Sequence, residues 1–270
     1  MNIIHKTIIF STLLLSACKT GNLNLVASID SELKEASAIE LVKGSDLLWT
    51  IEDAGNKNNI YGLDLKGNII KDIDVDNAKN DDWEDLTSDT MGNIYIGDFG
   101  NNSKKRKTFT IYKISNIANK TDETNADIID FKMPKGVKSE DFEAFFLLNN
   151  AFYIFSKDNK KNVLLKVPNS IGKHTAELIT EFKLDDGKDN KVTSAAISPD
   201  RKTVVLLNHD KLWKLTNFKG DNFFNGDITA HAFKHNSQKE GICFTNNNTV
   251  VISDEQKNST GGNIYTFSLN

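Results

Sequence analysis

The sequence predicts an all-β fold, a five-bladed β-propeller of four-stranded blades. Three observations favour it. Short runs of β-branched and aromatic residues recur through most of the 270-residue chain, five segments share one plan, and helical periodicity is nearly absent. Among candidate amphipathic helices, only residues 30–39 reach ten residues, which is too little helix for an α/β fold.

Each of the five segments begins with a polar residue that opens an apolar strand. These opening residues are Ser37, Glu84, Glu143, Ser194 and Glu240. After a turn comes a second apolar strand, expected over residues 47–52, 93–97, 152–156, 203–207 and 249–253. The next residue lies 14 positions after the opening residue in four segments and 16 in the first. Such regular spacing indicates a repeated structural unit.

Two further strands complete each unit except the last. Third strands are expected over residues 60–63, 109–112, 163–165, 212–215 and 264–267, and fourth strands over 69–75, 127–133, 177–184 and 227–233. The fifth unit has no fourth strand, and residues 23–29 form an unassigned one near the start. Pairing that strand with the last unit closes the propeller and covers an exposed edge. A β-sandwich or open barrel would not explain the periodic opening residues, and no stretch remains for a sixth blade.

The first residues have the layout of a signal peptide, expected over residues 1–17. The apolar run from Ile8 to Leu15 is too short to span a bilayer, which needs about 20 residues. Leu15-Ser16-Ala17-Cys18 resembles the bacterial lipobox, which implies lipidation of Cys18. We therefore expect a lipidated tether at 18–22 and the propeller at 23–270, on the periplasmic or surface side of a bacterial cell envelope. The alternative is a plain secretory signal with an incidental cysteine.

The charge and cysteine content of the chain limit the kinds of partner and cross-link that we expect. The net charge is −4 and the lysines are scattered, so no basic stripe indicates nucleic acid. Beyond Cys18 the sequence has one cysteine, Cys243, which excludes an internal disulfide and is expected to pack in the core. We expect a monomer that contacts the membrane through its lipid anchor alone.

The opening residues should meet on the propeller axis, because each begins the innermost strand of a blade. Three glutamates at one level would repel each other unless a cation lay between them. Carboxylate and hydroxyl oxygens suit Ca²⁺, whereas Mg²⁺ demands an octahedron that fits five-fold symmetry badly. No opening residue is His or Cys, which disfavours zinc and copper. The sequence thus predicts an axial Ca²⁺ site, the alternative being a hydrated channel.

Polar residues that follow the second strands should surround this site, because antiparallel pairing brings them back to the start of the inner strands. This set of rim residues, a candidate ligand-binding funnel, contains Asp53, Trp83, Asp98, Lys157, Asn208, His209, Asp254 and Glu255. Asp and Asn also favour strand ends as turn formers, which is the simpler interpretation of each residue alone.

The order of opening residues resembles that of the soluble calcium-activated nucleotidases, or apyrases, which are five-bladed propellers with a central Ca²⁺. The matching motifs are Glu35-Ala36-Ser37, Trp83-Glu84, Phe142-Glu143-Ala144, Thr193-Ser194 and Glu240-Gly241-Ile242. The first-blade turn Glu52-Asp53-Ala54-Gly55 lacks the arginine that the resemblance implies. Residues 81–85 and 96–101 also resemble uncharacterised exported bacterial propellers, which implies fold alone.

Two functions follow from these features. The first is a ligand- or partner-binding module whose Ca²⁺ fixes the blades. The second is a Ca²⁺-dependent hydrolase of nucleotides or other phosphoesters, whose metal would polarise phosphorus. Acids outnumber cations in the predicted funnel, which favours the binding module. The sequence assigns no catalytic residue and does not decide whether the protein is an enzyme.

Overall fold

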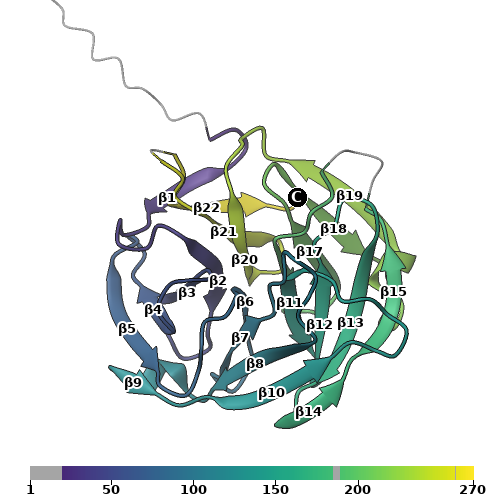
Figure 1. Cartoon of the computed structure of the whole chain (residues 1–270). Helices are drawn as coiled ribbons and strands as arrows, with labels where there is room; N and C mark the ends of the chain where they lie inside the picture. The colour runs from purple at the N-terminus through teal and green to yellow at the C-terminus, as the bar shows by residue number, and fades with distance from the viewer. Residues whose placement is uncertain (1–19, 185–188, 259) are drawn as a thin grey trace, which may run out of the picture.

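The structure is a computed structural model that describes residues 20–184, 189–258 and 260–270. These residues form five sheets around a common axis, seen end-on in Figure 1. The inner strands are β2 (Ala36–Leu41), β6 (Trp83–Ser88), β11 (Phe142–Leu148), β16 (Ser194–Ile197) and β20 (Lys239–Asn246). Each inner strand contacts the next in that order, and β20 contacts β2 again. The predicted five-bladed propeller is therefore confirmed.

The remaining strands follow in antiparallel order from the axis outward. Second strands are β3 (Leu48–Glu52), β7 (Ile94–Asp98), β12 (Ala151–Ser156), β17 (Thr203–Leu207) and β21 (Thr249–Asp254). Third strands are β4 (Asn59–Leu63), β8 (Thr108–Ile114), β13 (Asn162–Pro168), β18 (Lys211–Thr216) and β22 (Asn263–Ser268). Outer strands are β5 (Ile69–Val75), β10 (Asp127–Lys132), β15 (Glu177–Phe182) and β19 (Asp227–Ala232).

The last blade is completed by β1 (Asn24–Ser28), which pairs antiparallel with β22 at Leu25 and Tyr265. This is the closure that the sequence predicts. Two short strands were not expected. The segment β9 (Glu123–Thr124) adds in parallel to β5 of the first blade, and β14 (Gly172–Thr175) adds in parallel to β10 of the second. Each crosses from the following blade, so it links neighbouring blades at the outer edge.

The hydrophobic core lies between the blades, because each blade buries apolar side chains on both faces. Trp83 of β6, for example, packs with Ile51 and Ile60 of the first blade. Similar clusters fill the other interfaces between consecutive blades, including the one between the last and the first. Cys243 is 2% exposed in that last interface, so its prediction as a buried packing residue is confirmed.

Cys18 and residues 1–17 lie outside the described residues. The first described residues pack on the edge of the propeller: the backbone N–H of Asn22 donates to the Phe233 carbonyl at 2.7 Å, and its side chain donates to the Ala232 carbonyl at 2.9 Å. The short helices η1 (Ile117–Asn119) and η2 (Phe223–Asn225) are single turns. In the described part of the chain, no helix has the length and apolar character needed to cross a membrane.

Candidate functional site

A polar cavity of about 110 Å³ opens on the axis where the inner strands begin, and we call it the axial cavity. It contains four of the five opening residues and three of the predicted rim residues. Its lining is Glu35, Ala36, Ser37, Asp53, Glu84, Asn102, Glu143, Lys157, Gln238, Glu240 and Glu255. The sequence therefore places most of this cavity correctly, although the ligand roles assigned to these residues stay predictions.

Irregular pairing of the inner strands directs the three glutamates inward. The register with the second strand shifts between Trp83 and Asp85, leaving Glu84 as an extra residue, and the same occurs at Glu143 and Glu240. A β-bulge of this kind re-aims a side chain and bends the strand. The repeated bulge thus gives three blades the same carboxylate position at the axis.

Ser194 does not line this cavity. In β16 no bulge occurs, and Ser194 pairs directly with Leu207. Its hydroxyl donates to Asp85 Oδ1 at 2.9 Å and accepts from the Ile242 backbone N–H at 3.1 Å. Its expected place among the axial ligands is therefore not supported, because the missing bulge sets it one position deeper on the axis.

Asp85, which the sequence did not single out, ties the blades together below the cavity. The residue is fully buried. Its Oδ2 accepts from the Phe145 N–H of the third blade at 3.0 Å, and its Oδ1 accepts from Ser194 of the fourth. Since Ser194 in turn accepts from Ile242 of the fifth blade, one carboxylate connects four blades.

An internal ammonium group lies among the three axial glutamates. Lys157 is ion-paired with the buried Glu143. Burial opposes the charged ammonium, but the negative charges of Glu143, Glu240 and Glu84 outweigh it and raise the pKa of Lys157. The sequence places Lys157 on the rim, whereas the structure turns its charge toward the axis, where it offsets the nearest carboxylates.

Three acids of the first and second blades form a tight group, which we call the acidic triad. Asp53, Asp82 and Glu84 each offer a carboxylate oxygen, and these three oxygens lie within 4.8 Å of one another. The pKa of Asp82 is raised to about 6, mainly by burial and next by the negative charge of Asp53. The pKa of Glu84 is raised well above its ordinary value, mainly by burial and next by the negative charges of Glu143, Asp53 and Asp82. Burial and mutual repulsion therefore disfavour the charged forms of these carboxylates.

Glu84 is the most deeply buried member of the triad. The residue is 8% exposed, yet among the described residues no hydrogen bond or ion pair engages its carboxylate. Buried carboxylates are normally paired or bound to a metal. The Ser37 hydroxyl reaches the Glu84 backbone carbonyl at 2.6 Å instead, which fixes the strand and leaves the carboxylate directed at the cavity.

Asp98 and Gly100 hold Asp82 in place. Asp98 Oδ1 accepts from the Asp82 N–H at 3.1 Å and from Arg106 Nη1 at 2.8 Å, so this predicted rim residue supports the triad from behind. The Gly100 N–H donates to the Asp82 carbonyl at 3.1 Å. A Cβ at Gly100 would lie 2.1 Å from Glu84 Oε1 and 2.3 Å from Asp82 Cγ. The glycine therefore forms a cradle that both carboxylates fill.

Three other predicted rim residues lie away from the cavity. Trp83 is fully buried between blades because side chains alternate along a strand, so the neighbour of an inward Glu84 points away from the axis. The Asn208 side chain is engaged in a local hydrogen bond, because its nitrogen donates to the Lys191 carbonyl at 2.8 Å. Asp254 is fully buried and accepts from the Tyr265 hydroxyl at 2.9 Å. These three residues stabilise strand ends. The predicted funnel was therefore wrong to include them among the residues that surround the cavity.

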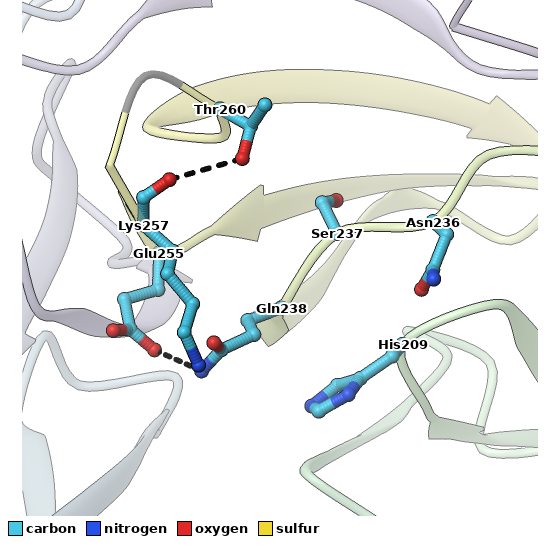
Figure 2. A pocket seen from close by; sticks show the side chains of 7 residues that line it. All are labelled: His209, Asn236, Ser237, Gln238, Glu255, Lys257 and Thr260. Atoms are coloured by element: carbon cyan, nitrogen blue, oxygen red, sulfur yellow. Dashed lines mark hydrogen bonds between the residues drawn. The ribbon is translucent and has the colours of Figure 1, made fainter.

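His209 lines a second space, which we call the side pocket. This pocket has a volume of about 440 Å³. Figure 2 shows the side chains that line it, which are those of His209, Asn236, Ser237, Gln238, Glu255, Lys257 and Thr260. It shares Gln238 and Glu255 with the axial cavity, so the two spaces adjoin. His209 Nε2 lies 3.2 Å from Glu240 Oε1, which makes the histidine a link between them.

The sequence analysis missed Glu35, Asp82 and Gln238. Each lies two positions before an opening residue, and alternate residues of a strand face the same side. The period of two is therefore the signal that could have found them. It also marks Asp141, whose carboxylate accepts from the Asn101 N–H at 2.6 Å instead.

No protein-family model and no curated protein matches this chain. Solved structures do resemble it. The Cps50 (Swd1) β-propeller domain from Myceliophteria thermophila has a TM-score of 0.50 at 10% identity, covering 92% of this chain and 100% of that one. The PQQ-bound aldose sugar dehydrogenase from Streptomyces coelicolor has a TM-score of 0.50 at 10% identity, covering 91% and 97%. At such low identity these likenesses carry the fold alone: the chain is a five-bladed β-propeller.

Proposed function

We propose that this protein is a Ca²⁺-dependent binding module of the cell envelope, with its cation held by the acidic triad. The observation that carries the proposal is Glu84, a buried carboxylate without a described partner beside two further acids. Burial, with the repulsion of neighbouring acids, raises the pKa values of these groups, and a divalent cation would favour their charged forms.

The donor set fits a hard cation. Asp53, Asp82 and Glu84 offer oxygen alone, which Ca²⁺ prefers and zinc sites usually supplement with nitrogen or sulfur. Backbone and water oxygens would complete a coordination number of six to eight. The cradle at Gly100 supports the same idea, because it brings two carboxylates against bare backbone. When bound, the cation would supply positive charge for oxygen atoms of a ligand.

This proposal differs from a symmetric axial site. Lys157 already offsets Glu143, and its charge acts on Glu240 and Glu84 as well. A second cation at the centre of the three glutamates would be repelled by that ammonium. The triad lies on the side of the first and second blades, where acids predominate. We therefore place the cation off the axis, with Glu84 as the one ligand shared with the original ring.

The side pocket is the proposed place of the ligand. It adjoins the cavity through Gln238 and Glu255 and offers both hydrogen-bond donors and acceptors. Phosphoester hydrolysis receives less support, because two cations at or behind the axial cavity are already paired. Lys157 pairs with Glu143, and Arg106 pairs with Asp98 at 2.8 Å. Polyphosphate chemistry needs such charges for the transition state.

We further propose that Cys18 is lipidated after export, which would hold the propeller at a membrane surface as a monomer. The lipobox resemblance supports this, and the hydrogen bond from the Asn22 N–H to the Phe233 carbonyl would start the tether beside the outer strand of the fourth blade. Metabolic labelling with an alkyne fatty acid tests it. We expect label on the wild-type protein and none on the Cys18→Ser variant, and equal labelling of both would contradict it.

Calorimetric titration with Ca²⁺ tests the cation site. We expect binding to the purified protein, a loss of at least tenfold in affinity for Glu84→Gln, and little change for the exposed control Glu181→Gln. Absence of Ca²⁺ binding would refute the proposal. Phosphate release from ADP with Ca²⁺ separates the two functions: release above the level of Glu84→Gln would favour the hydrolase.

A further inference from the structure

A second large cavity lies at the opposite end of the inner strands, and we call it the far cavity. Its volume is about 450 Å³, within the range of small-molecule sites. Its apolar part consists of Leu41 of β2, Leu147 and Leu148 of β11, and Ile197 of β16, all half-buried. These side chains end three different inner strands, so the apolar surface sits around the axis.

Arg201 crosses the mouth of the far cavity from the fourth blade to the third. Its turn is fixed by Ser198, whose carbonyl accepts from the Arg201 N–H at 2.8 Å. Arg201 adopts a positive φ of 62°, and its Nη1 donates to Asn149 Oδ1 at 3.2 Å. A guanidinium carries five N–H donors, and its side chain makes this one bond with the described residues, which leaves most of the donors available to a ligand.

Lys43 adds a second positive charge from the first blade. The residue is exposed and lines the far cavity, and among the described residues neither Lys43 nor Arg201 is ion-paired. Asp89 also lines the cavity, and its carboxylate, which accepts from Met91, Asn93 and Tyr95, offsets only one of these two positive charges. The mouth therefore keeps an excess of positive charge in a protein of net charge −4.

Glu40 also leaves this excess in place. It lies beside the cavity, where Ser88 donates to its Oε1 at 3.3 Å. Burial raises the pKa of Glu40 to about 8, so the side chain is uncharged at neutral pH.

We propose that the far cavity binds a small amphiphilic carboxylate, with its carboxylate between Arg201 and Lys43 and its hydrocarbon chain on Leu41, Leu147, Leu148 and Ile197. Arginine pairs bidentately with carboxylates, and lysine adds a flexible point charge. The leucines and isoleucine would be removed from water by an alkyl chain. This site is separate from the acidic triad, which lies at the other end of the inner strands.

Isothermal titration with octanoate tests the proposal on the intact protein. We expect saturable binding that weakens as the chain shortens to butanoate and that is unchanged by a Ca²⁺ chelator. The double variant Lys43→Gln and Arg201→Asn should lose about tenfold in affinity, the usual sum for two exposed ion pairs. Asn tolerates the positive φ at position 201. The control Lys202→Gln removes a neighbouring exposed charge that does not line the cavity and should bind as the wild type does.

Octylammonium separates charge recognition from simple hydrophobic adsorption. It has the same chain and the opposite charge, so it should bind at least tenfold more weakly than octanoate. Failure of octanoate to bind would overturn the proposal. Equal octanoate affinity in the double variant, or equal affinity for octylammonium, would overturn it too.

Discussion

Replacing Glu40 by Gln should change how the stability of the protein depends on pH. The Glu40 side chain is held beside the axis by the Leu41 N–H at 2.9 Å and the Ser88 hydroxyl at 3.3 Å. Burial is the largest influence on it and raises its pKa from 4.5 to about 8. In the unfolded chain the carboxyl loses its proton near pH 4.5, whereas in the folded protein it keeps the proton to about pH 8.

This difference in pKa decides whether the stability of the protein rises or falls with pH. Between these pH values the folded state binds the additional proton, so the stability contributed by Glu40 is full below pH 4.5 and falls until about pH 8. At about 1.4 kcal/mol for each tenfold change in proton affinity, the complete shift corresponds to about 5 kcal/mol. The residue is partly accessible to water, so we expect a smaller loss, about 2–4 kcal/mol.

Urea unfolding at pH 5 and pH 9 measures the effect. Gln keeps the hydrogen-bond acceptor and cannot ionise, so Glu40→Gln should match the wild type at pH 5 and exceed it by about 2–4 kcal/mol at pH 9. The exposed control Glu32→Gln should give the same difference from wild type at both pH values. A Glu40→Gln difference that does not grow with pH would refute this account of Glu40.

Three further predictions concern the axis. Asp85→Ala should destabilise the protein by about 2–4 kcal/mol in urea unfolding, because buried donors of the third and fourth blades lose their acceptor; a loss under about 0.5 kcal/mol would contradict its role as a tie. Gly100→Ala should weaken Ca²⁺ binding at least tenfold in titration, because the new Cβ displaces Glu84; unchanged affinity would disprove the cradle. Lys157→Met should tighten Ca²⁺ binding by removing a competing charge, while the unpaired Glu143 lowers stability without Ca²⁺ by about 3 kcal/mol; weaker Ca²⁺ binding would show that Lys157 does not oppose the cation.

Much of the fold was predictable because each blade repeats local signals. Alternating or continuous apolar runs between turn residues place the strands to within a few residues, as for β17 and β5, whose bounds match the expected ranges. The closure by β1 followed from counting strands against the missing outer strand. The added strands β9 and β14 were not predictable, because they are short and pair with a neighbouring blade.

The position of the site along the propeller axis was predictable from the sequence, but the full set of residues that line it was not. The spacing of opening residues found Glu84, Glu143 and Glu240, since equivalent positions on repeated strands converge. It could not show that three bulges place these residues or that β16 lacks one, which moves Ser194 deeper. Bulges depend on packing against neighbouring strands, which no single-strand pattern encodes.

The charge balance also depended on side-chain direction. Lys157 follows a second strand like the other rim residues, and nothing in its spacing shows that it turns toward Glu143. The acidic triad combines residues from two blades, Asp53 from the first and Asp82 from the second. Their proximity results from the packing of blades and becomes visible only in three dimensions.

A crystal structure of the protein soaked with Tb³⁺, a Ca²⁺ substitute with strong anomalous scattering, tests the central claim most directly. We predict an anomalous peak among Asp53, Asp82 and Glu84, with Lys157 still paired to Glu143. A peak at the centre of Glu84, Glu143 and Glu240 with Lys157 displaced, or no peak in the axial cavity, would contradict the proposed cation site.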